Sequence, residues 1–481
     1  MRSREDILGA IAEKRRGRIK AEGHSLGVEV PEERLYPLVE FGRAPFLICE
    51  VKRRSPSRGD IAPGLDPVSQ AGLYFRAGVK SVSVLTEEDH FKGSLTDLMR
   101  IKAAYPELAL LRKEFILDGE DLEVSYRAGA DAVLLIAALL DGETLRNLHD
   151  YTLELGMTPL VEVHTPEDAD KARRFEPQLV GINSRDLRTF TVDPLLPLER
   201  AALLDWEPRL VFESGIRYSE DVRLCRANGF AGALVGETVV RHPERLPELL
   251  KAAAAPVEGE GFWAEIARRR SAKKGAPLVK ICGLTSAEDV RLADELGADL
   301  LGFIFADSPR RTSADFINTI GDTMQKTRAL KVAVVVSDGG RIDPELHALL
   351  DAGLIDAVQF HGDETPEECA AAGVPYYKAL RIGSVADLDR AVDFRSPRVL
   401  LDARSAGVRG GSGRRIAADL VAEASTRGPV WLAGGISDEN VRSIVDQFHP
   451  ELIDLASGVE SAPGKKDHQK LRRLFAALSE V

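Results

Sequence analysis

The sequence predicts an α/β protein made of two tandem (β/α)8 TIM barrels, the first with an extra N-terminal helix. Three observations predict it. Short segments rich in Val, Ile and Leu alternate with helical segments along most of the chain. These apolar segments fall into two sets of eight, the number of strands that closes such a barrel. A length of 481 residues is enough for two or three domains that each bury a core.

The first predicted element is a helix over residues 4–20. Ile7, Leu8 and Ile11 are three and four residues apart and form an apolar stripe on it. The run from Lys14 to Lys20 is basic, and we expect these side chains to face solvent.

The first barrel is predicted from strands that show no polar face. Such strands are buried on both sides, as in a parallel sheet. The eight candidate strands are residues 46–52, 79–86, 109–115, 130–138, 157–164, 179–185, 209–215 and 232–237. Helical segments lie between them, for example residues 165–175 and 219–227. A doubly wound open sheet is the structural alternative, although it usually has fewer strands and a topological switch point.

The second barrel is predicted after a break in the pattern at residues 251–277. This segment holds an alanine run ending in proline, a Glu-Gly-Glu-Gly stretch and a charged helical piece, and it is predicted to be a linker. The eight candidate strands that follow are residues 278–283, 300–305, 330–338, 357–363, 376–382, 398–404, 429–435 and 453–460. We therefore expect a first barrel at 1–250, a linker at 251–277 and a second barrel at 278–481. The halves share few motifs, which favours two different barrels over a duplicated one.

The composition narrows the class of protein. A net charge of -12 is opposite to the basic balance of nucleic-acid-binding proteins. The four cysteines form no CxxC pair, so the sequence predicts neither a disulfide framework nor a zinc site and fits a reducing cytoplasm. No apolar run approaches the roughly 18 residues that span a membrane, and the N-terminus lacks a signal-peptide core. The nine histidines contain no HExxH pair, and we expect a cytoplasmic monomer without metal or cofactor.

Polar side chains gather where the first set of strands ends. In a (β/α)8 barrel, catalytic groups come from the carboxyl ends of the strands. The residues at these ends are Glu50, Lys52, Lys113, Glu162, Asn183, Arg185, Glu213 and Ser214. Structural ion pairs explain one or two such charges, but lysines and acids clustered at one rim suit acid–base chemistry. Burial of Lys113 is expected to lower its pKa toward neutrality and to make it a useful acid.

Glycines after the last two strands of this set predict an anion site. Gly215 ends the seventh strand, and Gly236 with Glu237 ends the eighth. Glycine lets a phosphate approach backbone N–H groups, and the N-terminus of the next helix favours the anion. The phosphate site of these barrels usually lies here.

Residues 1–250 resemble indole-3-glycerol-phosphate synthase. The motifs that carry the resemblance are Glu50-Val51-Lys52 with Ser55-Pro56-Ser57, Leu111-Arg112-Lys113-Glu114-Phe115, Leu160-Val161-Glu162-Val163, Gly181-Ile182-Asn183-Ser184-Arg185 and Glu213-Ser214-Gly215-Ile216. That family closes an indole ring on a phosphorylated carboxyphenylamino-deoxyribulose with loss of CO2 and water. The resemblance implies Lys113 as the general acid on the ketone, Glu162 as an aid to dehydration, and Lys52 as a contact to the phosphate and carboxylate. The other implied site residues are Glu50, Ser55, Asn183, Arg185, Glu213, Ser214 and, against the aromatic ring, Phe91.

The second set of strands ends in a different group of reactive side chains. Cys282 lies at the end of the first strand of this set, and Asp402 lies near the end of the sixth. A cysteine in a strand is as readily a core residue as a catalytic one. Small residues again follow the seventh and eighth strands where a phosphate is expected. They are Gly434, Gly435, Ser457 and Gly458.

Residues 278–481 resemble phosphoribosylanthranilate isomerase. The supporting motifs are Lys280-Ile281-Cys282-Gly283, Ser308-Pro309-Arg310, Gln359-Phe360-His361-Gly362-Asp363, Lys378-Ala379-Leu380-Arg381 and Ser457-Gly458-Val459-Glu460. That family performs an Amadori rearrangement. The resemblance implies that Asp402 protonates the furanose ring oxygen, that Cys282 removes the C2′ proton and that Arg310 binds the anthranilate carboxylate. It also implies His361 and Arg381 as substrate contacts.

The two resemblances imply consecutive steps of tryptophan biosynthesis, because the isomerase product is the synthase substrate. Both substrates are anionic phosphates, so in a net acidic chain their attraction must be local, from Lys52, Lys113, Arg185 and Arg310. Two alternatives remain open. The barrels could act on another sugar phosphate, or one half could be a non-catalytic binding module.

Overall fold

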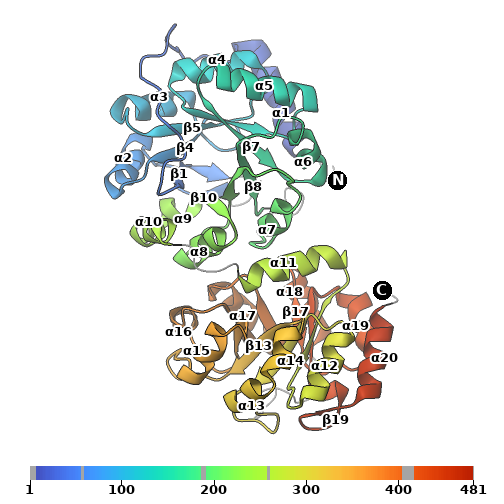
Figure 1. Ribbon diagram of the computed structural model, residues 1–481. Helices are drawn as coiled ribbons and strands as arrows, with labels where there is room; N and C mark the ends of the chain where they lie inside the picture. The colour runs from blue at the N-terminus through green and yellow to red at the C-terminus, as the bar shows by residue number, and fades with distance from the viewer. Residues whose placement is uncertain (1–6, 56–58, 186–190, 257–260, 404–415, 480–481) are drawn as a thin grey trace. The chain divides into compact units, whose positions relative to one another are not determined.

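The structure of the chain is a computed structural model, which describes residues 7–55, 59–185, 191–256, 261–403 and 416–479. The chain divides into two compact units, Met1–Glu260 and Gly261–Val481. Each unit contains a closed barrel of eight parallel strands (Figure 1). The predicted fold class is therefore confirmed.

The first barrel closes through its first strand. β1 (Leu47–Val51) pairs in parallel with β4 (Ser81–Leu85) on one side and with β10 (Phe230–Val235) on the other. The strands between them in the ring are β5 (Ala109–Lys113), β6 (Ala132–Ile136), β7 (Thr158–Val163), β8 (Leu179–Asn183) and β9 (Arg209–Glu213). Alternate side chains point inward, and Ile48 and Leu134 belong to the apolar cluster that fills the ring.

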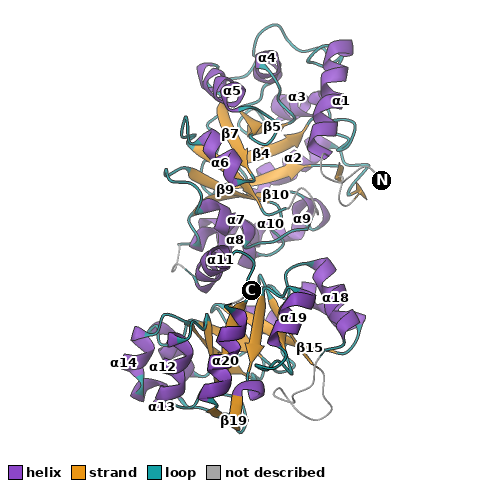
Figure 2. Ribbon diagram, turned by 90° about the vertical axis from the view of Figure 1, so that its right-hand side faces the viewer, coloured by secondary structure: helices purple, strands orange, loops and turns teal. Residues whose placement is uncertain are grey.

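Helices surround the strands of each barrel, as the purple ribbons of Figure 2 show. Those of the first unit are α1 (Ile7–Glu22), α2 (Pro67–Ala77), α3 (Leu95–Ala104), α4 (Gly119–Ala128), α5 (Gly142–Glu154), α6 (Pro166–Ala172), α7 (Leu196–Ala201), α8 (Ser219–Ala227), α9 (Glu237–Arg241), η2 (Pro243–Arg245) and α10 (Leu246–Ala254). A short hairpin, β2 (Arg54–Ser55) and β3 (Gly59–Asp60), follows β1. Helices α2 to α6 each start at an Asp, Ser or Thr whose side chain accepts a backbone N–H, which satisfies donors that a helix start leaves unpaired.

The expectation that the basic residues of α1 all face solvent is wrong for Arg15. This side chain is buried and donates to the carbonyl of Phe115 at 3.1 Å and to Asp121 Oδ1 at 2.7 Å. It also lies 3.5 Å from the carboxylate of Glu114. Arg15 is four residues after Ile11, so it continues the apolar stripe instead of the exposed face. The helix is thereby joined to the segment that follows β5.

The second barrel is built in the same way. β11 (Leu278–Cys282) pairs in parallel with β12 (Leu300–Ile304) and with β18 (Leu452–Leu455). The other strands are β13 (Leu330–Val335), β14 (Ala357–Phe360), β15 (Tyr376–Ile382), β16 (Val399–Ala403) and β17 (Trp431–Ala433). The helices are α11 (Phe262–Lys273), α12 (Ala287–Glu295), α13 (Ala314–Thr319), α14 (Gly321–Lys326), α15 (Pro344–Asp351), α16 (Pro366–Ala371), α17 (Val385–Asp389), η3 (Arg390–Asp393), α18 (Ala418–Arg427), α19 (Val441–Phe448), η4 (Ser457–Val459) and α20 (His468–Leu478). A hairpin of β19 (Glu460–Ala462) and β20 (Lys465–Lys466) follows η4.

Helix α11 lies within the segment predicted to be the linker, and it packs on the second barrel. Phe262 stacks on Tyr377 with ring centroids 6.2 Å apart, and the rings of Trp263 and Trp431 are 5.8 Å apart. Tyr377 and Trp431 lie near the amino ends of β15 and β17. The helix therefore covers the end of the barrel opposite the rim that carries the reactive side chains.

We expect a fragment of residues 278–481 to be less stable than one of residues 261–481 by roughly 3–6 kcal/mol. Phe262, Trp263 and Ile266 are buried, and each such side chain contributes about 1.5–3 kcal/mol, offset in part by the entropy of ordering the helix. Urea denaturation followed by circular dichroism measures the difference. A fragment of residues 255–481 is the control and should match 261–481. Equal stability of all three fragments would show that α11 is only a connection.

No helix in the described ranges combines the length and apolar composition needed to cross a membrane.

Candidate functional site

The first site lies at the carboxyl ends of the strands of the first barrel. Lys113 is the last residue of β5, Asn183 the last of β8 and Glu213 the last of β9. Glu50 and Glu162 are each one residue from the ends of β1 and β7. Five of the predicted site residues therefore come to one rim.

Lys113 is at the centre of the charged group. Its Nζ atom lies 3.0 Å from Glu213 Oε2 and 3.6 Å from Glu50 Oε2. The other oxygen of Glu50 accepts a hydrogen bond from Lys52 Nζ at 2.6 Å. Burial raises the pKa of Glu50, but Lys52 and Lys113 outweigh it and hold this pKa below its ordinary value. Glu50 is therefore an anion that bridges the two lysines.

The prediction that Lys113 has a lowered pKa is wrong. Burial does lower the pKa of Lys113, but the carboxylates of Glu213, Glu50 and Glu162 outweigh burial and raise it above its ordinary value. Lys113 is thus an ammonium ion at neutral pH. It can donate a hydrogen bond to a developing negative charge on a carbonyl oxygen, because its proton is always present.

Glu162 has a partner that the sequence reasoning missed. His164 Nε2 lies 2.6 Å from Glu162 Oε1, and both side chains are buried. Burial raises the pKa of Glu162, but His164 and Lys113 outweigh it and lower this pKa to about 2. His164 follows Glu162 by two residues, and side chains two apart in an extended segment share a face. This spacing was the available signal.

Of the three acids around Lys113, Glu213 is the one whose ionised form is least favoured. Its Oε1 atom is buried and has no hydrogen-bond donor among the described residues. A Cβ atom at Gly181, on the neighbouring strand β8, would overlap this oxygen, so the glycine makes the space for it. Burial and the neighbouring Glu162 carboxylate outweigh Lys113 and raise the pKa of Glu213 to about 7. When Glu213 is protonated, its carboxyl group can donate a hydrogen bond to the Glu162 carboxylate.

Replacing Glu213 with glutamine is expected to change how stability depends on pH. Between the ordinary pKa of about 4.3 and about 7, the folded chain binds a proton on Glu213 that the unfolded chain has lost. The wild-type free energy of unfolding therefore falls as pH rises through this range, and in Glu213→Gln this fall should be smaller by about 1–3 kcal/mol. Calorimetry at pH 5 and pH 8 measures it, with the exposed Glu207→Gln as control. The same fall in both variants would place the proton elsewhere.

The predicted phosphate residues of the first barrel are tightly packed. Gly215 has a φ of +81°, and a Cβ atom there would lie 2.7 Å from a methyl group of Val192. A Cβ atom at Gly236 would lie 2.6 Å from Glu50 Oε1. The carboxylate of Glu237 pairs with the guanidinium of Arg241 at 3.0 Å. The part of Glu237 that suits an anion is therefore its backbone N–H and not its side chain. Any residue larger than glycine at 236 would displace Glu50.

The remaining predicted residues of this site lie around the charged group. Asn183 Oδ1 accepts the backbone N–H of Arg185 at 3.0 Å, and Ser214 has a φ of +69°. Ser55 is buried in the hairpin after β1, and residues 56–58 of its motif lie outside the described residues. Phe91 packs against the apolar cluster inside the ring.

The loop that carries Phe91 is held by Glu87, which the sequence reasoning also missed. The buried carboxylate of Glu87 accepts the backbone N–H groups of His90 at 2.7 Å and Phe91 at 3.0 Å. The sequence signal was a run of three acidic residues, Glu87 to Asp89, shortly after an apolar strand.

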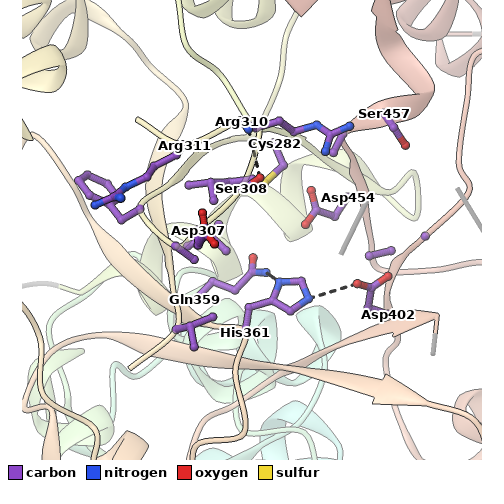
Figure 3. Close-up of a pocket in the computed structure, with 18 of the residues that line it drawn as sticks. Cys282, Asp307, Ser308, Arg310, Arg311, Gln359, His361, Asp402, Asp454 and Ser457 are labelled. Carbon is purple, nitrogen blue, oxygen red and sulfur yellow. Dashed lines mark hydrogen bonds and ion pairs between the residues drawn. The ribbon is translucent and has the colours of Figure 1, made fainter. Parts of the chain in front are cut away.

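The second site is a cavity of about 690 Å³ in the second barrel. Figure 3 shows side chains from several strands turned toward it. Its lining includes these predicted residues: Cys282, Arg310, His361, Asp402, Gly434, Gly435, Ser457 and Gly458. Arg381 is not among the lining residues, and its guanidinium instead pairs with Asp363.

Cys282 ends β11 with its thiol buried. A Cβ atom at Gly302, on the neighbouring strand β12, would lie 2.6 Å from its sulfur, so the glycine makes the space for the thiol. Burial raises the pKa of Cys282, whereas Lys280 lowers it, and the net result lies above the ordinary value.

Asp402 lies on β16 across the cavity from Cys282 (Figure 3). Its Oδ2 atom is 3.2 Å from His361 Nε2, and its Oδ1 atom accepts the backbone N–H of Ala403 at 2.8 Å. Both oxygens of the carboxyl are thus held by neighbours. An acid and a thiol that face one cavity can donate and accept protons at two different atoms of one small substrate.

Arg310 is oriented by an acid of the β19 hairpin. Its guanidinium donates to the two carboxylate oxygens of Glu460 at 2.8–3.0 Å. Lys466 Nζ lies 3.0 Å from the same carboxylate and donates to the carbonyl of Cys282 at 2.6 Å. Glu460 therefore joins the predicted carboxylate-binding arginine to the strand that carries the thiol.

Four buried polar residues form a connected group, two of which, Gln359 and Asp454, also line the cavity, and the sequence reasoning assigned none of the four a role. Lys280 Nζ donates to Asp454 Oδ2 at 2.7 Å and to Gln359 Oε1 at 2.5 Å. Tyr377 donates its hydroxyl to the same Gln359 oxygen at 2.9 Å. The sequence signal for this group was a lysine inside β11 and an aspartate inside β18, which are otherwise apolar strands. Buried charges need partners, so the two predict a buried ion pair.

In the described part of the chain, the group of potential metal ligands that lie closest together is outside both rim clusters. There, His24, Asp118 and Asp121 bring three ligand atoms within 4.8 Å of one another, outside both sites.

Comparison with known proteins gives matches for both units. The family model of indole-3-glycerol phosphate synthase matches residues 10–249, and that of N-(5'-phosphoribosyl)anthranilate isomerase matches residues 279–477. A tryptophan biosynthesis protein of Phytophthora nicotianae is 31% identical over 86% of this chain and 88% of its own length. An indole-3-glycerol phosphate synthase of Desulfotalea psychrophila is 39% identical over 49% of this chain and 94% of its own length.

A multifunctional tryptophan biosynthesis protein of Phycomyces blakesleeanus is 32% identical over 89% of this chain and 62% of its own length. The chain spans about three fifths of the length of this protein and of two similar multifunctional relatives.

Proposed function

The chain belongs to the family of tryptophan biosynthesis proteins in which an indole-3-glycerol phosphate synthase domain precedes an N-(5'-phosphoribosyl)anthranilate isomerase domain, and from this premise we propose that it catalyses both reactions. The second barrel isomerises N-(5-phosphoribosyl)anthranilate to 1-(2-carboxyphenylamino)-1-deoxyribulose 5-phosphate. The first barrel closes and decarboxylates that product to indole-3-glycerol phosphate. The observation that supports the proposal is that Lys113 lies among acids at the rim of the first barrel, and that Cys282 and Asp402 line one cavity in the second.

In the second barrel, Asp402 gives a proton to the furanose ring oxygen, and the bond from that oxygen to C1′ breaks. The nitrogen lone pair forms the C=N bond of an iminium ion. Cys282, as thiolate, then removes the C2′ proton, and the resulting enolamine tautomerises to the amino ketone. Lys280 supports this step because its positive charge lowers the pKa of the Cys282 thiol against the effect of burial. Arg310 binds the anthranilate carboxylate, and Gly435 with Ser457 binds the phosphate.

In the first barrel, the Lys113 ammonium donates to the ketone oxygen while the aromatic carbon attacks the carbonyl carbon. The ketone oxygen takes a proton from Lys113 and becomes a hydroxyl, loss of CO2 restores the ring, and Lys113 regains a proton from solvent. Lys113 then protonates the hydroxyl, which leaves as water. Glu162 accepts the proton released in that dehydration, which its lowered pKa permits because it is ionised at neutral pH. Lys52 contacts the phosphate and carboxylate, and Phe91 contacts the aromatic ring.

An assay of the purified chain with N-(5-phosphoribosyl)anthranilate tests the proposal. The substrate should disappear first, the amino ketone should appear transiently, and indole-3-glycerol phosphate should accumulate with release of one CO2 and one water per molecule. Supplying the amino ketone directly separates the steps. Turnover of other sugar phosphates in place of these two would reject the assignment.

We further propose that the barrels are separable at residues 251–277 and that the chain works as a cytoplasmic monomer. All four cysteines are buried free thiols, which suits a reducing compartment. Light scattering of the full chain measures its mass, and a dimer mass would contradict this part of the proposal.

A further inference from the structure

A line of hydrogen bonds crosses the second barrel from Lys280 to Asp402. Lys280 on β11 donates to Gln359 Oε1 at 2.5 Å, and Gln359 Nε2 lies 3.0 Å from His361 Nδ1. His361 Nε2 in turn lies 3.2 Å from Asp402 Oδ2. Figure 3 shows the last two of these contacts as dashed lines from Gln359 through the imidazole to the carboxyl group.

Lys280 decides which way the amide of Gln359 points. An ammonium group has three donors and no acceptor, so the Gln359 atom at 2.5 Å from it must be the oxygen. Lys280 keeps its charge because the Asp454 carboxylate is 2.7 Å away. The hydroxyl of Tyr377 at 2.9 Å can donate or accept and does not orient the amide by itself.

The orientation of Gln359 then decides which nitrogen of His361 carries the proton. The amide NH2 group faces Nδ1, so Nδ1 must accept a hydrogen bond from it. A proton on Nδ1 would place two hydrogen-bond donors opposite each other. The ring proton is therefore on Nε2, which donates to Asp402 Oδ2. The backbone N–H of Ala403 holds Oδ1. The plane of the Asp402 carboxyl is thereby fixed at the edge of the cavity.

We infer that Lys280, acting through Gln359, fixes His361 as its Nε2–H tautomer and so orients the Asp402 carboxyl group for proton transfer. Lys280, Gln359 and His361 are positioning residues in this view. The inference rests on the proposed isomerase function in that it takes Asp402 as the acid. A carboxyl held in one plane delivers its proton along one direction, which lowers the reorganisation needed at the ring oxygen.

The ring nitrogens of His361 can be observed directly. In full-length protein with 15N-labelled histidine, the nitrogen shifts of each neutral imidazole report which atom is protonated. The variant His361→Gln identifies the signals of this residue among the nine histidines. We expect His361 to be protonated at Nε2 and not at Nδ1. Protonation at Nδ1 in the wild-type chain overturns the inference.

The substitution Gln359→Glu should reverse the pattern with almost no change of shape. One carboxylate oxygen keeps the contacts to Lys280 and Tyr377, while the other presents an acceptor to Nδ1 where the amide presented a donor. We expect Nδ1 to become protonated and isomerase kcat to fall about tenfold or more with little change in KM. Gln469→Glu, an exposed change of the same charge in the same barrel, should alter neither. An unchanged His361 tautomer in Gln359→Glu overturns the inference.

The role of Lys280 itself is tested in the double variant Lys280→Met/Asp454→Asn, which avoids leaving the buried aspartate unpaired. The amide then loses its orienting donor, and we expect signals of both His361 tautomers. A single Nε2–H signal there overturns the part assigned to Lys280. Because the tautomer is measured without substrate, it is independent of activity: the expected tautomers in a chain that does not isomerise phosphoribosylanthranilate would reject the proposed function and leave the tautomer assignment standing.

Discussion

Replacing Lys113 with methionine is expected to lower synthase kcat about a thousandfold and to leave isomerase turnover unchanged. A positioned proton donor typically contributes 10²–10⁴-fold, and the Lys113 ammonium is within 3.6 Å of both Glu50 and Glu213 at the centre of the first rim. Methionine keeps the length of the side chain while removing the donor. Synthase activity is measured with the amino ketone as substrate, so that the first reaction does not limit it.

Two controls allow the result for Lys113→Met to be interpreted. Lys80→Met changes an exposed lysine just before β4, at the opposite end of the barrel, and should be neutral. Isomerase activity of Lys113→Met reports whether the second barrel is intact, and its loss would show that the barrels do not work independently. Synthase activity above about a tenth of the wild-type value would remove Lys113 from the role of general acid.

The reverse result is expected for Cys282→Ala, with isomerase kcat reduced about a thousandfold and synthase activity retained. The alanine side chain cannot accept the C2′ proton, and nearby Asp454 is already paired with Lys280 at 2.7 Å. Isomerase turnover is measured with N-(5-phosphoribosyl)anthranilate in the presence of excess wild-type synthase barrel.

Cys369→Ala is the matched control, since Cys369 is a buried thiol on α16 that does not line the cavity. It should cost about 1 kcal/mol of stability and leave both activities intact. Near-normal isomerase turnover in Cys282→Ala would reject this thiol as the base, and Asp402→Asn would then be the variant that tests whether the remaining acid is needed.

The strands could be predicted because their signal is local. Each apolar segment in both sets became a barrel strand, and polar residues such as Glu50 and Asp402 were found near the carboxyl ends. A buried parallel strand needs a continuous apolar run, and the residue that ends the run stands at the rim. These two facts need no knowledge of which strands are neighbours.

The errors share another origin. Lys113 was expected to have a lowered pKa from burial alone, but the acids that raise it, Glu50, Glu162 and Glu213, come from three other strands. Arg15 was placed in solvent because its partners follow β5, about a hundred residues later in the chain. The packing of helix α11, which lies within the predicted linker, likewise depends on distant aromatic partners, on β15 and β17.

The order of residues was thus enough to predict two barrels, and to predict which polar side chains lie at the carboxyl-end rim of each. Which charges meet, and hence the direction in which the pKa values of Lys113 and Glu213 shift and the tautomer that we infer for His361, depends on the folded chain. The physical reason is that electrostatic and hydrogen-bond energies depend on distances of a few ångströms between groups that closure of the barrel brings together. No pattern within a single strand contains those distances.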